Sequence, residues 1–249
     1  MRSQFQWISI EFKCFIRNYT AVFFTLIFPP LLLVIFGEIY GNDPLPMFDN
    51  LGTIDACTPA YICMVICVAG IMSLPLSLTG YREKKILKRF KASPASPWQI
   101  IVAQIIVNFL MTMVGTILLL LIAKFRYEIT FSGNVMQVLL AYLLCVISVF
   151  SIGFFVASII HNAQAAMAVS NVIYFPMLFL SGATIPIETM PDTIKDISKY
   201  IPLSYAVDLM KSTWQGGKIF DDATSIIVLG SIAIVCIAFS LLFFSWDSE

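Results

Sequence analysis

The sequence predicts an all-α polytopic membrane protein with six transmembrane helices. Of its 249 residues, 59% are hydrophobic and only 12% are charged, and its mean hydropathy is +0.89. Soluble domains carry about 25% charged residues. Apolar runs long enough to cross about 30 Å of hydrocarbon occupy residues 20–39, 57–79, 98–123, 135–160, 164–185 and 223–246. We therefore expect a single transmembrane domain over residues 1–249.

The segment before the first run predicts a helix over residues 3–18 that lies in the membrane interface. Its apolar and polar residues fall on opposite helical faces: Phe5, Ile8, Phe12, Phe15, Ile16 and Tyr19 on one, and Gln6, Ser9, Lys13 and Arg17 on the other. Such a helix is either a simple anchor or an elbow helix that touches a cytoplasmic partner. The run at 20–39 shows no small-residue cleavage site, so we expect it to remain as a signal anchor.

The distribution of charge predicts the orientation of the chain. Short cytoplasmic loops are enriched in Lys and Arg, and here the basic residues gather near the N-terminus and at 81–91. Acidic residues gather in the loops on the other side, among them Asp43, Asp49, Asp55, Asp221 and Asp222. We therefore expect a multi-pass protein of the cell membrane with both termini in the cytoplasm.

A basic segment, YREKKILKRFK at 81–91, separates the second and third spans. As a helix it would place Ile86, Leu87 and Phe90 on one narrow apolar stripe. Glu83 falls on that stripe, so we expect it to pair with Lys13 or Arg17, or with a docked subunit. The alternative is a solvated helix that binds anionic lipid. Residues 96–99, Ser-Pro-Trp-Gln, predict a capped start for the third span.

A second unusual segment, residues 181–217, is too polar to span and too apolar for a free loop. Pro191 and Pro202 divide it into two stretches whose apolar residues recur at helical spacing. In the second stretch these are Leu203, Ala206, Met210 and Trp214. We expect a pair of short re-entrant helices, within 186–215, that close the outer face of the bundle.

Two stretches carry a family resemblance: YREKKILKRFKASPASPWQIIVAQ at 81–104, and FLSGATIPIETMPDTIKDISKYIPLSYAVDLMK at 179–211. In this order and with six spans, they resemble the permeases of the type-2 ABC exporter family, and most closely its drug- and antibiotic-resistance-like members. The resemblance covers the whole chain. It implies that 81–91 is a coupling helix that rests on an ATP-hydrolysing subunit, and that the N-terminal helix is the connecting helix.

The resemblance carries site residues with it. Those implied in ATPase coupling are Tyr81, Arg82, Glu83, Lys84, Lys85, Ile86, Leu87, Lys88, Arg89 and Phe90, with Lys13 and Arg17 on the N-terminal helix. Those of the external motif are Leu180, Ser181, Gly182, Pro186, Pro191, Pro202, Leu203, Ser204, Tyr205 and Asp208.

No G-x-x-x-x-G-K-[ST] phosphate loop occurs in the sequence. We therefore expect no cofactor and no catalytic site on this chain, and ATP and Mg on a separate ABC ATPase subunit. The resemblance also implies a second permease protomer, either a copy of this chain or a homologue, and no nucleic acid. We interpret His161 as a solvated turn residue. Cys63 and Cys67 are interpreted as buried small side chains, not as metal ligands.

Polar residues inside spans mark either a transport path or hydrogen bonds between helices. Gln104, Asn108 and Thr112 recur every four residues on the third span. The resemblance implies that the second and fifth spans line the pathway, where Asn171 and Phe175 lie. The candidate path residues are thus Asn108, Thr112, Asn171 and Phe175. The 21 Phe and 11 Met favour a hydrophobic small molecule or lipid as substrate.

These observations favour an ATP-driven exporter permease for hydrophobic drugs, antimicrobials or lipid-like molecules. Export of a glycolipid, a polysaccharide or an ion remains an alternative within the same family. A non-ABC secondary transporter is less favoured, because ionisable residues are missing from the middle of the spans. A non-transporting membrane scaffold or immunity protein is also less favoured, and it would be distinguished by whether the basic segment needs an ATPase.

Overall fold

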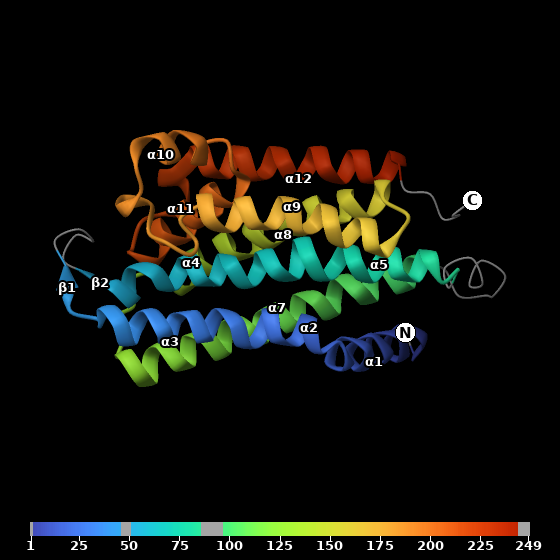
Figure 1. Ribbon diagram of the computed structural model, residues 1–249, viewed down its shortest axis with the longest axis horizontal. Helices are drawn as coiled ribbons and strands as arrows, with labels where there is room; N and C mark the ends of the chain where they lie inside the picture. The colour runs from blue at the N-terminus through green and yellow to red at the C-terminus, as the bar shows by residue number, and fades with distance from the viewer. Residues whose placement is uncertain (1, 46–50, 86–96, 244–249) are drawn as a thin grey trace.

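The computed structural model describes residues 2–45, 51–85 and 97–243. Among these residues six helices are long and apolar enough to cross a membrane, as the sequence predicts. They are Tyr19–Tyr40, Thr53–Glu83, Gln99–Tyr127, Val135–Ile159, Ala163–Leu180 and Ile219–Phe243. Figure 1 shows them side by side along the long axis of the molecule.

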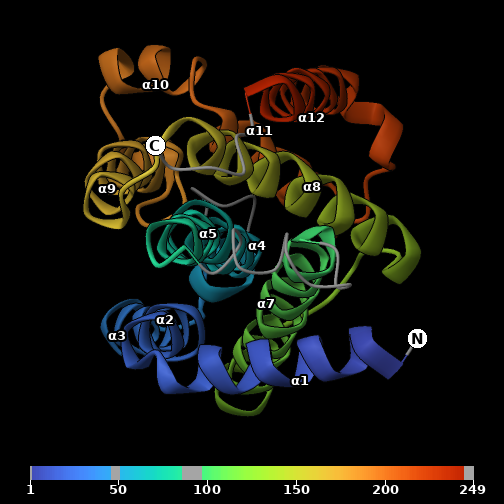
Figure 2. The ribbon, with the colours of Figure 1, turned by 90° about the vertical axis from the view of Figure 1, so that its right-hand side faces the viewer.

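The first span bends where its prolines occur. It consists of α2 (Tyr19–Val22), the π-helical turn η1 (Phe23–Ile27) and α3 (Phe28–Tyr40). Pro29 and Pro30 occupy the first turn of α3 and lack the backbone N–H that an α-helix would use. The wider π turn directly before them accommodates the missing donors. Ahead of the span, α1 (Arg2–Arg17) crosses one end of the bundle (Figure 2), which we call the α1 end.

The second span also contains a π-helical turn before a proline. Its parts are α4 (Thr53–Cys67), the π turn η3 (Val68–Ser73) and α5 (Leu74–Glu83), with Pro75 in the first turn of α5. This helix is longer at both ends than the predicted run at 57–79. At its start, Asp55 accepts hydrogen bonds from Thr130 N at 2.9 Å and Thr130 Oγ1 at 3.1 Å. Polar residues at both ends are bonded inside the protein, so the helix continues past the apolar run.

A short strand pair follows the first span, and one helix forms most of each later span. Strands β1 (Pro44–Leu45) and β2 (Leu51–Gly52) form a short antiparallel pair between the first two spans. The later spans contain α7 (Pro97–Tyr127), α8 (Val135–Ile159), α9 (Ala163–Leu180) and α12 (Ala223–Phe243). The fifth helix ends at Leu180, before the predicted limit of 185, and Gly182 follows with a φ of +80°. That conformation favours glycine.

The second span is the centre of the molecule. In its most apolar window 83% of the residues are buried, compared with 17% in the last span. Figure 2 shows α4 and α5 surrounded by α7, α8, α9 and the first span, with α12 outside. Gly70 of η3 and Gly153 of α8 allow the closest approach, because a Cβ on Gly153 would collide with the backbone carbonyl of Gly70. The second and fourth spans therefore pack backbone to backbone.

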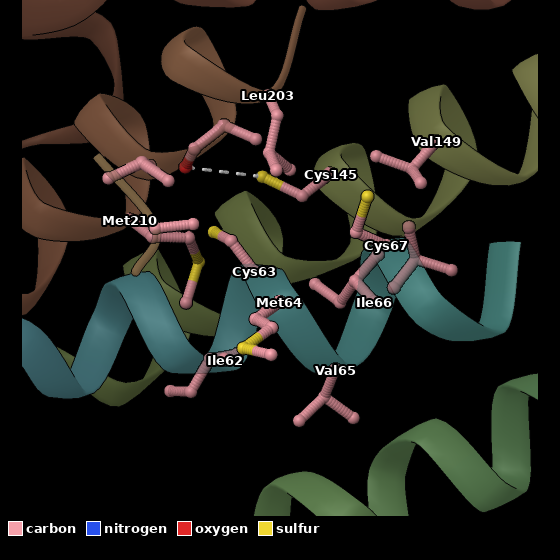
Figure 3. Packing of buried hydrophobic residues seen from close by; sticks show 14 of the residues in the cluster. Ile62, Cys63, Met64, Val65, Ile66, Cys67, Cys145, Val149, Leu203 and Met210 are labelled. Atoms are coloured by element: carbon pink, nitrogen blue, oxygen red, sulfur yellow. Dashed lines mark hydrogen bonds between the residues drawn. The ribbon is translucent and has the colours of Figure 1, made fainter. Parts of the chain in front are cut away.

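The cysteines of the second span lie in this core. Figure 3 shows Cys63 and Cys67 facing α8 and α11 beside Cys145, whose Sγ donates to the carbonyl of Ala206 at 3.7 Å. All three cysteine side chains are fully buried. No group of three or more potential metal ligands occurs in the described ranges. The interpretation of Cys63 and Cys67 as buried small side chains is confirmed.

The end opposite α1, which we call the α10 end, carries the short helices. They are η4 (Ile187–Thr189), α10 (Asp192–Ser198), α11 (Pro202–Trp214) and η5 (Ile219–Asp222). The apolar face expected for the second short helix is buried in α11, at Leu203, Ala206, Met210 and Trp214. In α10, however, Ile197 is 46% exposed. That these helices re-enter a membrane stays a prediction.

Candidate functional site

The end of α5 is bonded to the turn between α8 and α9. Arg82 Nη1 donates to the carbonyls of Ala157 at 2.8 Å and Ile160 at 3.0 Å, at the C-terminal end of α8. Glu83 Oε2 accepts from the backbone N–H of Ala163 at 2.9 Å, at the first residue of α9. We call this pair of contacts the Arg82–Glu83 bridge.

The electrostatics of helix ends explain the bridge. The C-terminal end of a helix carries partial negative charge and free carbonyls, and the N-terminal end carries partial positive charge and free N–H groups. Arg82 of α5 places a cation at the C-terminal end of α8, and Glu83 of α5 places an anion at the N-terminal end of α9. Each helix end thus meets the charge that it favours. The side chain of Asn162 adds a cap to α9 by accepting from Gln164 N at 2.7 Å and Ala165 N at 3.2 Å.

The bridge corrects the partner predicted for Glu83 on the N-terminal helix. We expected Lys13 or Arg17, but these side chains are exposed on α1, and Glu83 bonds to Ala163 instead. The cause is that α5 continues to Glu83 and brings the carboxylate to the start of α9. A further contact of Glu83 with a docked subunit stays a prediction.

The other residues implied in coupling separate into three groups. Tyr81 turns inward, and its hydroxyl donates to Glu11 Oε2 at 2.9 Å. Lys84 and Lys85 are exposed in a turn after α5, where Lys85 has a φ of +54°. The predicted coupling helix therefore does not begin at Tyr81, since residues 81–83 are the last turn of the span. The remaining coupling residues lie outside the described residues: Ile86, Leu87, Lys88, Arg89 and Phe90.

Glu11 is a buried carboxylate that the sequence analysis did not single out. It is 3% exposed and accepts from Tyr81 Oη and, at 2.6 Å, from Gln104 Nε2. Burial removes water from the charged form and raises the pKa of Glu11 to about 7. The hydrogen bonds from Tyr81 and Gln104 favour the charged form and lower the pKa, but their effect is smaller than that of burial. Glu11 lies three residues after Ile8 and four before Phe15, which places it on the apolar face of the helix. That position is the signal in the sequence that could have revealed its burial.

The polar stripe of α7 is buried, with hydrogen bonds running along the helix. Asn108 Nδ2 donates to the carbonyl of Gln104 at 2.9 Å, and Thr112 Oγ1 donates to the carbonyl of Asn108 at 2.7 Å. Thr112 is fully buried, so its hydroxyl contributes to packing in this conformation. Asn108 lines a cavity beside Glu11. A transport role for either residue stays a prediction.

A larger apolar cavity of about 290 Å³ lies where the first, second and fifth spans meet. Phe24, Val68 and Met72 line it from the first two spans, and Asn171 and Phe175 line it from α9. Phe175 is 48% exposed and its ring stacks on Phe179 with centroids 6.4 Å apart. The two fifth-span residues predicted for the substrate path thus lie together at one cavity.

The external motif forms the junction between α9, α10 and α11. Ser181 Oγ accepts from Ala183 N at 3.3 Å next to Gly182. Tyr205 Oη donates to the carbonyl of Lys199 at 2.6 Å, which joins the start of α11 to the end of α10. Pro191 immediately precedes α10, and Pro202 is the first residue of α11. The remaining motif residues are Leu180, Pro186, Leu203, Ser204 and Asp208, of which Leu203 and Ser204 are buried.

Comparison with known proteins places the chain among membrane transport proteins. The sequence model of the ABC-2 type transporter family matches residues 4–213. The chain is 24% identical over 156 residues to the probable multidrug ABC transporter permease YbhR of Escherichia coli (strain K12), a match covering 63% of this chain and 42% of that protein. It is 25% identical over 160 residues to the inner membrane transport permease YhhJ of the same organism, covering 62% and 43%.

A third relative, the probable multidrug ABC transporter permease YbhS of Escherichia coli (strain K12), is 21% identical over 162 residues, covering 65% of this chain and 43% of that protein. The chain thus spans less than half the length of the curated relatives it matches. The family match extends from α1 to α11. The chain belongs to the ABC-2 type transporter family.

Proposed function

We propose that this chain is the membrane-spanning part of an ATP-driven exporter that moves hydrophobic drugs, antimicrobials or lipid-like molecules out of the cell. Two relatives are named as probable multidrug ABC transporter permeases. The apolar cavity at Phe175 suits a hydrophobic substrate. ATP and Mg would bind a separate ATPase subunit, and a second protomer would complete the pathway at the exposed face of α9.

The single observation that carries this proposal is the Arg82–Glu83 bridge. The part of the basic segment that follows α5, and that would meet the ATPase, begins with the exposed Lys84–Lys85 turn directly after Glu83. A force applied there reaches α5 first. Because the bridge bonds α5 to both sides of the α8–α9 turn, the same force reaches α9. One side of the apolar cavity belongs to α9, so ATP hydrolysis would be coupled mechanically to the substrate path.

Charge reversal in the exposed turn tests this proposal. We expect the tagged chain, extracted in mild detergent from its native membrane, to copurify with an ATP-binding subunit identified by mass spectrometry. The variant Lys84→Glu/Lys85→Glu should lose that subunit, because charges at the rim of an interface control association. The matched control is Lys124→Glu/Lys218→Glu, which reverses two exposed lysines outside the α1 end and should retain it.

A transport assay completes the test. Inverted membrane vesicles should accumulate a hydrophobic dye when ATP is added, and the variant Lys84→Glu/Lys85→Glu should not. The proposal would be overturned if the wild-type preparation contained no ATP-binding subunit and if the dye moved at the same rate with and without ATP. Equal loss of the subunit from both double variants would remove the coupling role from the turn.

A further inference from the structure

A polar cavity lies at the α1 end, enclosed by α1, α5 and α7. Its volume is about 190 Å³, and we call it the polar chamber. Figure 2 shows α1 running across α7 at this end of the molecule. Glu11 and Asn18 line it from the α1 side, Ser73 and Tyr81 from the second span, and Asn108 from α7. The chamber is thus lined by polar side chains from all three of its walls.

Two deeply buried atoms of the chamber have no hydrogen-bond partner among the described residues. They are Asn108 Oδ1, in a residue that is 1% exposed, and Ser73 Oγ, in a residue that is 6% exposed. The amide of Asn108 cannot be reversed without loss, because its Nδ2 donates to the carbonyl of Gln104. Buried polar atoms are normally satisfied by protein groups or by water, so these two atoms are the acceptors to which a ligand or a water would donate.

Glu11 supplies a third acceptor. Both of its hydrogen bonds, from Tyr81 and Gln104, reach Oε2. Gln104 also connects Glu11 to Asn108, since Asn108 Nδ2 lies 3.4 Å from Gln104 Oε1. Glu11, Asn108 and Ser73 therefore line one small chamber, in which Asn108 Oδ1 and Ser73 Oγ are unpaired acceptors and Glu11 contributes a carboxylate.

The chemistry of these acceptors selects a primary ammonium group. It carries three N–H donors, no acceptor and a positive charge. A quaternary ammonium has the charge but no donor, and an alcohol has one donor but no charge. Of these three groups, only the primary ammonium combines several N–H donors with a charge for the carboxylate. The lysine that lines the chamber, Lys84, is itself exposed in the turn after α5.

The surroundings indicate that this ammonium belongs to an amphiphile. Asn18, Ser73 and Leu76 line both the polar chamber and the apolar cavity beside it. Most of the side chains that bound that neighbouring cavity are apolar, among them Phe24 and Val68. A molecule with its ammonium in the chamber and its hydrocarbon in the apolar cavity satisfies both sites at once.

We propose that the polar chamber binds the primary ammonium group of an amphiphile, with Glu11 as counter-charge and Asn108 and Ser73 as acceptors. The source of the ammonium is either a membrane lipid with an ethanolamine headgroup or an amine that the protein transports. In the second case the inference rests on the proposed export function. The binding site itself does not need ATP or a partner.

The test compares three ligands with the same tail: dodecylamine, dodecyltrimethylammonium and dodecanol. Each is titrated against the full chain in detergent at pH 8, with binding followed by thermal unfolding and intrinsic fluorescence. Dodecylamine should raise the unfolding temperature and bind roughly tenfold or more tightly than the other two, because only it combines a positive charge with several N–H donors. Equal effects of all three ligands would overturn the proposal and leave a chamber that holds water only.

Variants locate the site. Glu11→Gln keeps the shape and removes the charge, and should abolish the preference for dodecylamine. Ser73→Ala removes one acceptor with little change in volume and should weaken binding several-fold, which keeps the test valid if Glu11→Gln does not fold. The control Glu38→Gln removes an exposed carboxylate that pairs with Arg126, and should bind dodecylamine like the wild type. Unchanged preference in both chamber variants would refute the assignment.

A lipid experiment separates the two sources. The chain is placed in nanodiscs that contain equal amounts of phosphatidylethanolamine and phosphatidylcholine, and the lipids it retains are identified by native mass spectrometry. Selective retention of phosphatidylethanolamine, lost in Glu11→Gln, would establish a lipid ligand. Equal retention of both lipids, together with selective binding of dodecylamine, would establish a free amine. Neither result depends on ATP-driven transport, so failure of the export proposal would be seen separately.

Discussion

Glu11 is the residue whose surroundings differ most from those usual for its type. A carboxylate on an amphipathic helix normally faces water, but this one is enclosed by α5 and α7. The titratable side chains that line the chamber with it are Tyr81, Cys14 and Lys84. Burial raises the pKa of Glu11 from 4.5 to about 7. Between these two pH values, Glu11 therefore keeps its proton in the folded protein without a ligand and loses it in the unfolded chain.

The proton on Glu11 predicts how stability depends on pH. Below pH 4.5 the carboxyl is neutral in both states, so burial costs little. As the pH rises to about 7 the unfolded chain ionises first, and the folded state loses on the order of 3 kcal/mol of stability. The unfolding temperature of the wild type should therefore fall between pH 5 and pH 8 more steeply than that of Glu11→Gln. Parallel curves for the two proteins would contradict this prediction.

The sequence predicts the role of a residue well when the residue's partners are close in the chain, and poorly when they are distant. Gln104 and Asn108 were recognised because polar residues within an apolar run are visible in the sequence. The role of Glu11 was missed because it depends on Tyr81 and Gln104, which are 70 and 93 residues away in the chain. The partner that we expected for Glu83 on the N-terminal helix was wrong for the same reason, since the amide of Ala163 is 80 residues away.

At the scale of elements, hydropathy located each spanning helix but not always its ends. The helix predicted at 57–79 extends over Thr53–Glu83 because Asp55 and Arg82 have partners inside the protein. A hydropathy window counts such residues as polar and stops before them. The π turns before Pro29 and Pro75 were also beyond prediction, because a proline marks the interruption of a helix but not the geometry that absorbs it.

The contact between the second and fourth spans yields a prediction about Gly153. In Gly153→Ala the new Cβ collides with the backbone of Gly70, which cannot rotate away as a side chain would. We expect α8 to be displaced from η3 and the unfolding temperature to fall markedly, with a cost of about 1–3 kcal/mol.

The matched control is Gly230→Ala in α12, where a Cβ meets nothing within 4 Å. Alanine is favoured over glycine in a helix by about 1 kcal/mol, so this variant should be as stable as the wild type or slightly more so. Both variants are measured by thermal unfolding in the same detergent. Equal stability of Gly153→Ala and Gly230→Ala would show that the two spans are not held backbone to backbone.

At the scale of the whole molecule, α1 and the end of α12 lie at the same end of the bundle, as Figure 1 shows. The number of spans and their order followed directly from the sequence. Which side faces the cytoplasm depends on charge in the loops, and this remains a prediction.

Cysteine labelling tests the orientation. Lys84→Cys places a thiol at the α1 end and Lys218→Cys places one near the α10 end, both at exposed positions. The background carries Cys14→Ser, because Cys14 is exposed. A membrane-impermeant maleimide should label Lys218→Cys in intact cells, and Lys84→Cys only in inverted vesicles. The reverse pattern would place the α1 end outside the cell and exclude an ATPase contact at the basic segment.

The turn between α8 and α9 also makes the protein well suited to spectroscopy. Its exposed His161 is the one histidine of the whole sequence, and it lies between the residues that Arg82 and Glu83 hold. Isotope labelling of one ring carbon of histidine would therefore yield a single imidazole signal in a magnetic resonance spectrum, without any mutation. The chemical shift of that signal would report movement of α5 relative to α9 throughout a transport cycle, in the native chain.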